Sequence, residues 1–190
     1  MARATGIGLQ DFEKVRTSNN FYIDKTDFIR KWWESNDDVT LITRPRRFGK
    51  TLNMSMTEKF LSVEYAGRGD MFEGLSIWQD GAFRQMQGTW PVISLSFAKV
   101  KETSYLDARK KMCHTITGLY NKYDFLTDGG LLNEKEKDFY RKVSADMEEY
   151  IATESINFLS GILERYYGKR VIILLDEYDT PMQEAYVYGY

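Results

Sequence analysis

The sequence predicts an α/β fold in which a parallel sheet is flanked by helices. Three observations carry this prediction: a strand–loop–helix pattern over residues 39–65, a second strand pattern at 90–97, and an apolar run that begins at 171. Helical patterns separate these strands, and strands that alternate with helices are typical of α/β domains. The 190 residues suffice for one core, so we expect a single domain over residues 1–190.

The first half of the chain predicts a helix, a strand and a second helix. A helix begins near Asp24 or Thr26, because apolar side chains follow at helical spacing, at Phe28, Ile29, Trp32 and Trp33. The run "VTLIT" at 39–43 indicates a short buried strand. A helix is expected over 50–65, and its inward residues are Leu52, Met56, Phe60 and Leu61.

The second half predicts two further strands with helices between them. Residues 66–90 are rich in glycine and indicate loops, and "WPVISLSF" at 90–97 indicates a strand. Helices are expected over 104–123 and, as one or two segments, over 134–167. The run "VIILLDEYD" at 171–179 has no polar alternation, which is typical of a strand covered on both faces.

Composition excludes several classes of protein. The net charge of −2 gives no global basic field, so a nucleic-acid contact would need a local patch. No apolar run approaches the about 20 residues that cross a bilayer, and the N-terminus lacks the apolar core of a secretory signal. A single cysteine, Cys113, forms no internal disulfide. We therefore expect a cytoplasmic protein with no membrane partner.

The stretch "RPRRFGKT" matches the second half of a phosphate-binding loop. The Walker A pattern is G-x-x-x-x-G-K-[ST]. Gly49, Lys50 and Thr51 supply its end, whereas Arg44 stands where the first glycine would be. The expected nucleotide-binding residues are Arg44, Pro45, Arg46, Arg47, Phe48, Gly49, Lys50, Thr51 and Leu52. The predicted strand before the loop and the predicted helix after it are the context that such a loop requires.

The residue types suit the binding of a magnesium triphosphate. Backbone amides around Gly49 and the N-terminal end of the following helix attract phosphate oxygens. Lys50 reaches the β- and γ-phosphates, and the Thr51 hydroxyl binds Mg²⁺. Pro45 stiffens the loop, and Arg46 and Arg47 add positive potential.

An apolar strand that ends in Asp176 and Glu177 matches the Walker B pattern. Asp176 would hold Mg²⁺ and Glu177 would polarise the attacking water as a general base. Lys50 and Glu177 are thus the predicted catalytic residues, and Thr51 and Asp176 the predicted metal ligands. The nearby Asp179 is expected to cap the segment that follows.

Four blocks in order resemble the AAA-ATPase-like family of bacterial and archaeal proteins: "FYIDKTDFIRKWW", "LITRPRRFGKTLNMSM", "WPVISLSF" and "VIILLDEYDTPM". The resemblance covers residues 6–188, and the arginine-rich loop without its first glycine is similar to that family's own loop. It implies a P-loop NTPase fold with an added strand between the Walker strands. ATP and Mg²⁺ are the implied ligands, bound by Lys50, Thr51, Asp176 and Glu177 in the roles above.

The resemblance also implies that further sequence belongs to the intact protein. Family members commonly carry a C-terminal nuclease-like domain of the PD-(D/E)XK kind, and in this fold type a sensor strand follows Walker B. The chain ends soon after Asp179, so we expect the N-terminal portion of a P-loop ATPase domain with an incomplete sheet. Either the two Walker strands close up, or a partner (a second copy or another protein) fills the gap, or the fragment is only marginally stable.

The leading hypothesis is an ATP-binding module whose Mg²⁺-dependent ATP hydrolysis drives a conformational change in the intact protein. A second hypothesis is a nucleotide-sensing module without turnover, and a third is a small-molecule kinase. A fourth gives Arg44, Arg46 and Arg47 an additional contact with nucleic acid. Phe21 or Tyr22 could line an adenine pocket, although aromatics at this spacing are more often part of a core.

Overall fold

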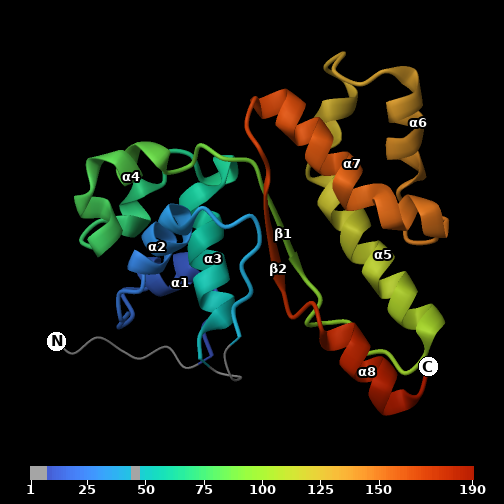
Figure 1. Ribbon diagram of the computed structural model, residues 1–190, viewed down its shortest axis with the longest axis horizontal. Helices are drawn as coiled ribbons and strands as arrows, with labels where there is room; N and C mark the ends of the chain where they lie inside the picture. Colours follow the sequence, from blue (N-terminus) through green and yellow to red (C-terminus); the bar gives the residue numbers. More distant parts are fainter. Residues whose placement is uncertain (1–7, 44–47) are drawn as a thin grey trace. The chain divides into compact units, whose positions relative to one another are not determined.

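The computed structural model describes residues 8–43 and 48–190 (Figure 1). The chain forms two compact units, Met1–Val92 and Ile93–Tyr190, with the division at the start of strand β1. A two-stranded parallel sheet is present, built from β1 (Val92–Ser96) and β2 (Ile172–Asp176). The mixed α/β class and the parallel sheet are therefore confirmed, whereas the P-loop topology and the single domain stay predictions.

The first unit is helical in its described part. Its elements are α1 (Phe12–Thr17), α2 (Asp27–Ser35), α3 (Lys50–Leu61), α4 (Gly81–Met86) and the 3₁₀ helices η1 (Val63–Tyr65), η2 (Gly69–Phe72) and η3 (Ser76–Gln79). Phe72 is fully buried between two other aromatic rings, stacked on Phe12 at 5.1 Å and edge-on to Phe60 at 5.0 Å between ring centroids. These rings join α1, η2 and α3 into one core.

Helix α3 forms where the sequence predicts a helix, and it ends four residues earlier. Met56, Phe60 and Leu61 are buried as expected, whereas Leu52 is only half-buried. The expected span of 50–65 was too long because the backbone changes to an extended conformation at Ser62. The Ser62 hydroxyl then caps η1 by accepting a hydrogen bond from the Glu64 amide at 3.2 Å.

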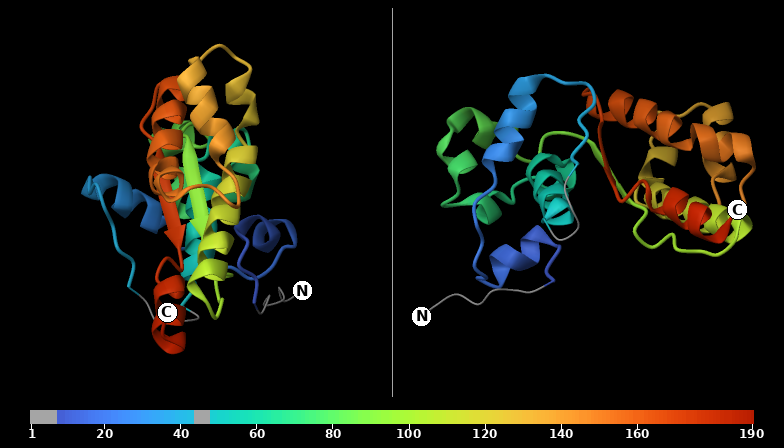
Figure 2. Two further views of the ribbon diagram at one scale, coloured as in Figure 1. Left: turned by 90° about the vertical axis from the view of Figure 1, so that its right-hand side faces the viewer. Right: turned by 60° about the horizontal axis from the view of Figure 1, so that its bottom comes forward.

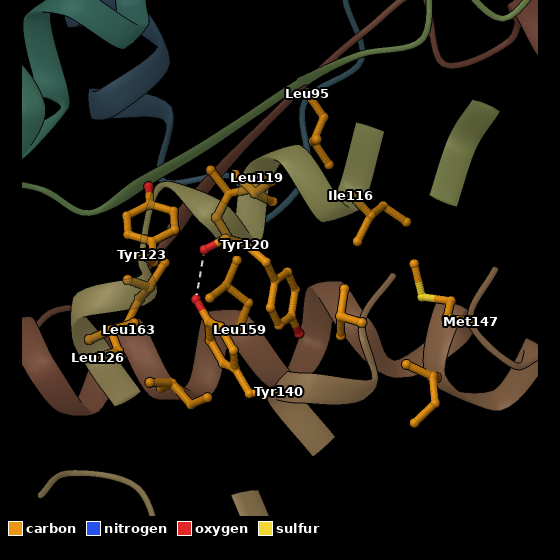
Figure 3. Packing of buried hydrophobic residues seen from close by; sticks show 14 of the residues in the cluster. Leu95, Ile116, Leu119, Tyr120, Tyr123, Leu126, Tyr140, Met147, Leu159 and Leu163 are labelled. Atoms are coloured by element: carbon orange, nitrogen blue, oxygen red, sulfur yellow. Dashed lines mark hydrogen bonds between the residues drawn. The ribbon is translucent and has the colours of Figure 1, made fainter. Parts of the chain in front are cut away.

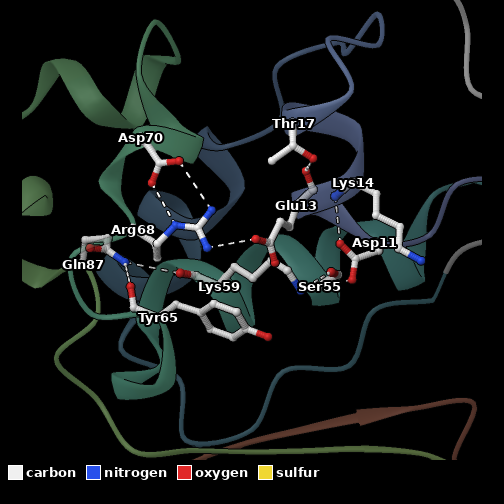
Figure 4. A network of polar contacts seen from close by, with 10 residues as sticks. All are labelled: Asp11, Glu13, Lys14, Thr17, Ser55, Lys59, Tyr65, Arg68, Asp70 and Gln87. Atoms are coloured by element: carbon white, nitrogen blue, oxygen red, sulfur yellow. Dashed lines mark hydrogen bonds and ion pairs between the residues drawn. The ribbon is translucent and has the colours of Figure 1, made fainter.

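A network of polar contacts holds α1 against α3 (Figure 4). The Asp11 carboxylate caps α1 by accepting from the Lys14 amide at 3.0 Å. Its other oxygen lies 3.4 Å from the ammonium of Lys59, a residue whose side chain is almost wholly buried in α3. The same ammonium lies 3.3 Å from the Ser55 hydroxyl and 4.9 Å from the centre of the Tyr65 ring. The buried charge is thus compensated by an anion, a hydroxyl and an aromatic face.

The strand predicted at 39–43 is wrong. Residues 39–43 have no strand assignment, and Val39 and Leu41 are 87% and 63% exposed. A strand needs a neighbour that completes its backbone hydrogen bonds. No β-bridge in the described part of the chain includes these residues, so their backbone has no neighbouring strand there.

The second unit holds the sheet and the helices that follow its two strands (Figures 1 and 2). Its helices are α5 (Tyr105–Asn121), α6 (Glu134–Lys142), α7 (Glu149–Tyr167), α8 (Thr180–Tyr188) and the 3₁₀ helix η4 (Asp124–Thr127). The region 134–167 therefore holds two helices, with a break over 143–148. Helix α5 packs along α7, and Ile93 and Leu95 of β1 belong to the same buried cluster as residues of both helices (Figure 3).

Two buried tyrosines lock this core by hydrogen bonds to backbone carbonyls. The Tyr140 hydroxyl donates to the Tyr120 carbonyl at 2.7 Å (Figure 3), and the Tyr120 hydroxyl donates to the Ser155 carbonyl at 2.7 Å. Burial raises the pKa of both hydroxyls well above the ordinary value, so both remain donors in the physiological range. The bonds tie α6 to α5 and α5 to α7.

Strand β2 is covered on one face only. Leu174 is buried, whereas Ile173 and Leu175 on the opposite face are 42% and 45% exposed. The expectation that this strand is covered on both faces is therefore wrong for the described structure. The sequence did not distinguish one covered face from two, because a strand with one covered face usually carries polar side chains on the other and this strand is apolar up to its last residue.

Candidate functional site

The predicted phosphate loop leads directly into helix α3. Arg44, Pro45, Arg46 and Arg47 lie outside the described residues, so the predictions for them stay predictions. The described end of the loop starts at Phe48, which is 60% exposed, and continues through Gly49 into the first helical residue, Lys50. The end of the loop and the start of the helix thus coincide as a phosphate-binding segment requires.

Gly49 occupies the helix-capping position in a left-handed conformation, with φ 78° and ψ 21°. This conformation is energetically unfavourable for any residue with a Cβ atom, whereas glycine adopts it freely. The Gly49 carbonyl accepts the first helical hydrogen bond, from the Asn53 amide at 2.9 Å. Amides of the first turn of a helix have no partner within that helix, and the helix dipole makes this end positive.

Lys50, Thr51 and Leu52 form the first turn of α3, and all three are half-buried. The Lys50 ammonium makes no ion pair with any described residue. An ammonium without a carboxylate at a positive helix end is electrostatically unbalanced, and an anion would restore the balance. This end of α3 therefore has the charge and the backbone donors of an anion-binding site.

The predicted Walker B acids lie at the carboxyl end of β2. Asp176 is the last residue of the strand, and its carbonyl accepts from the Phe97 amide at 3.0 Å. Glu177 follows with a φ of 51°, which is uncommon for a residue with a side chain. Both residues are half-buried, and neither carboxylate makes a hydrogen bond or ion pair with the described residues. Both acids thus stand at the end of β2 without a polar side-chain partner among the described residues.

Asp179 stands at the N-cap position of α8, as predicted, but it does not act as a side-chain cap. Its carboxylate accepts from the side-chain amide of Gln183 at 2.6 Å instead. The backbone at Asp179 is already helical, which points the side chain away from the first-turn amides. The expected position is confirmed, and the expected interaction is wrong.

The aromatic candidates for an adenine pocket behave differently from each other. The Tyr22 hydroxyl contacts the Met56 sulfur at 3.1 Å, and its ring meets Phe12 edge-on at 5.4 Å. Burial raises the pKa of Tyr22 to about 12. Tyr22 therefore packs as a core residue, whereas Phe21 is exposed.

The site residues fall into two groups. Gly49, Lys50 and Thr51 belong to the first unit, and Asp176 and Glu177 belong to the second. One residue near the loop, Lys25, was not predicted from the sequence. A Cβ atom built on Gly49 would lie 3.7 Å from the ammonium of Lys25. In the sequence, Lys25 is the lysine of "YIDKT" in the first of the four blocks, but no spacing rule links that block to the loop.

The predicted metal ligands suit magnesium by their chemistry. Thr51 offers a hydroxyl and Asp176 a carboxylate, and Mg²⁺ prefers such oxygen ligands. Among the described residues, no group of three His, Cys, Asp or Glu side chains gathers to hold a metal by itself. A site with one or two protein ligands fits Mg²⁺, which takes most of its ligands from phosphate and water.

No helix in the described part of the chain is both long enough and apolar enough to cross a lipid bilayer.

Comparisons with known proteins point to one family. A family model described as "Predicted AAA-ATPase" (AAA-ATPase-like) matches residues 6–189. The chain is also similar to a protein of Azotobacter chroococcum mcd 1, named "Uncharacterized protein in vnfD 5'region". The two are 28% identical over 180 residues, which is 93% of this chain and 29% of that protein. The chain thus spans less than a third of the relative's length. No solved structure matches.

Proposed function

The chain belongs to the AAA-ATPase-like family, and from this premise we propose that it binds the phosphates of Mg²⁺–ATP at the N-terminal end of α3. One observation carries the proposal. Gly49 turns left-handed immediately before a 12-residue helix whose first side chain, Lys50, has no anionic partner among the described residues. Backbone donors, the helix dipole and an ammonium then act together on one anion.

Each predicted residue has a role in this proposal. Lys50 contacts the β- and γ-phosphates, and the loop residues surround them: Arg44, Pro45, Arg46, Arg47, Phe48, Gly49 and Leu52. The Thr51 hydroxyl and the Asp176 carboxylate would hold Mg²⁺, which neutralises phosphate charge when bound. Glu177 accepts a proton from the attacking water. The proposal requires that Asp176 and Glu177 approach the same nucleotide as Lys50.

Hydrolysis would switch the conformation of the intact protein. The left-handed backbone at Glu177 supports a functional role for this residue, because such strain tends to persist where function requires it. A homo-oligomer or partner protein, contact of the loop arginines with nucleic acid, and a cytoplasmic location stay predictions.

Binding is tested by titrating the chain with Mg²⁺–ATP before and after Lys50→Ala. We expect the variant to bind about 10- to 100-fold more weakly, because a charge-assisted hydrogen bond is lost. The matched control is Lys14→Ala, which removes an exposed lysine of α1 from the same unit. Equal affinity of wild type and Lys50→Ala would refute the proposal.

Turnover is tested separately by single-turnover hydrolysis of bound ATP. We expect Glu177→Gln to bind ATP like the wild type and to hydrolyse it at least about 100-fold more slowly, the usual contribution of a general base. Binding without turnover in the wild type would instead support the nucleotide-sensing hypothesis. Transfer of phosphate to a metabolite rather than to water would support a kinase.

A further inference from the structure

We propose that Lys25 is a second phosphate-binding lysine, which acts on the same phosphate chain as Lys50. The inference rests on the proposed function and extends its site to a segment that no part of the Walker A pattern includes. The observation behind it is the 3.7 Å separation between the Lys25 ammonium and the position that a Cβ on Gly49 would take. The ammonium therefore lies directly beside the backbone that would hold the phosphates.

Two residues that flank Lys25 fix its backbone to η3. One Asp24 carboxylate oxygen accepts from the Ser76 amide at 2.7 Å, and the other accepts from the Thr26 amide at 2.8 Å. Thr26 is fully buried, and its hydroxyl accepts from the Ile77 amide at 3.2 Å. The Thr26–Ile77 hydrogen bond is buried and therefore costly to break, so the backbone position of residue 25 is well defined.

A second attachment joins this segment to α3 itself. The Lys25 amide lies 3.3 Å from the Tyr22 hydroxyl, and that hydroxyl contacts the sulfur of Met56 on α3 at 3.1 Å. Because Gly49 caps the same helix, the segment and the loop share one support. The backbone that carries the Lys25 side chain is thus attached, inside one unit, to the helix that Gly49 caps.

The charge at Lys25 is available for a ligand. Its side chain is exposed and makes no ion pair with any described residue. The neighbouring carboxylate of Asp24 accepts hydrogen bonds from Ser76 and Thr26 and makes no ion pair with Lys25. An ammonium is a compact point charge with three donors, which suits the oxygens of a phosphate. Two such lysines beside one left-handed glycine would favour a polyphosphate over a nucleoside.

The test compares the affinities of wild type, Lys25→Ala, Lys25→Arg, Lys50→Ala and Lys14→Ala for Mg²⁺–ATP and for adenosine. We expect Lys25→Ala to weaken ATP binding about 10- to 100-fold, with no effect on adenosine. Lys25→Arg should restore most of the loss, and Lys14→Ala should bind like the wild type. Urea unfolding midpoints equal to that of the wild type would show that the variants are folded.

A second measurement does not depend on substitution. Mild amine acylation followed by mass spectrometry should show that Mg²⁺–ATP protects Lys25 and Lys50, whereas Lys14 reacts equally with and without nucleotide. Wild-type affinity of Lys25→Ala, with weak binding by Lys50→Ala, would overturn the role of Lys25 and leave the proposed function in place. Wild-type affinity of both variants would overturn both.

Discussion

Replacing Glu177 by glycine should stabilise the protein while abolishing hydrolysis. The Glu177 backbone has a φ of 51°, and the left-handed conformation costs a residue with a side chain about 1–2 kcal/mol. Glycine avoids that cost, and its extra freedom in the unfolded chain offsets about 0.5–1 kcal/mol. The Glu177 carboxylate has no hydrogen bond or ion pair among the described residues, so no polar contact of the side chain is lost. The net gain should be about 0.5–1 kcal/mol.

Urea unfolding of wild type, Glu177→Gly and Glu177→Ala measures this gain. Alanine keeps the backbone cost, so only the glycine variant should have a higher unfolding midpoint. The matched control is Glu154→Gly, an exposed position inside α7, where glycine should lose about 1 kcal/mol. A glycine variant at 177 that is no more stable than the alanine variant would refute the idea that strain is stored at this residue.

Two further perturbations test the first unit. A Cβ on Gly88, which has a φ of 69°, would lie 2.4 Å from the Cα of Ala66, so Gly88→Ala should lower the free energy of urea unfolding by about 2–5 kcal/mol. Gly67 has a φ of 79° and open space around it, so Gly67→Ala should lower that free energy by only about 1–2 kcal/mol. Equal losses in the two variants would contradict the clash at Gly88. Partial burial raises the pKa of Asp24, but the hydrogen bonds that it accepts outweigh this and lower the pKa below 3.8. The contribution of the Asp24 carboxylate to stability is therefore present above pH 3.8 and is lost as pH falls through the lower folded-state pKa. The stability difference between wild type and Asp24→Asn should shrink from about pH 6 to about pH 3. A constant difference would contradict the assignment.

Elements with a strong local pattern were predictable from sequence. Helix α5 and strands β1 and β2 lie where periodicity and apolar runs put them, and α5 and β1 bury side chains in one core. Helix α1 was overlooked, since it has only 6 residues and two buried apolar side chains. Its signal was Asp11 followed by Glu13, which is the charge pattern of a helix start.

The failures share one physical cause, which is that sequence patterns do not specify neighbours. Residues 39–43 have the composition of a strand, yet a strand exists only beside another backbone. The uninterrupted run before Asp176 predicted cover on both faces, and only one is covered in the described structure. Lys25 was missed for the same reason, since its approach to Gly49 depends on contacts with Met56 and Ser76 far along the chain.

The open face of β2 has a practical consequence at the bench. Ile173 and Leu175 present branched apolar side chains to water on a strand, and such surfaces adhere to one another as protein concentration rises. A preparation of these 190 residues should therefore bind hydrophobic dyes and show concentration-dependent light scattering. Nucleotide titrations are best begun in dilute samples, where self-association of the protein does not change the signal that reports ligand binding.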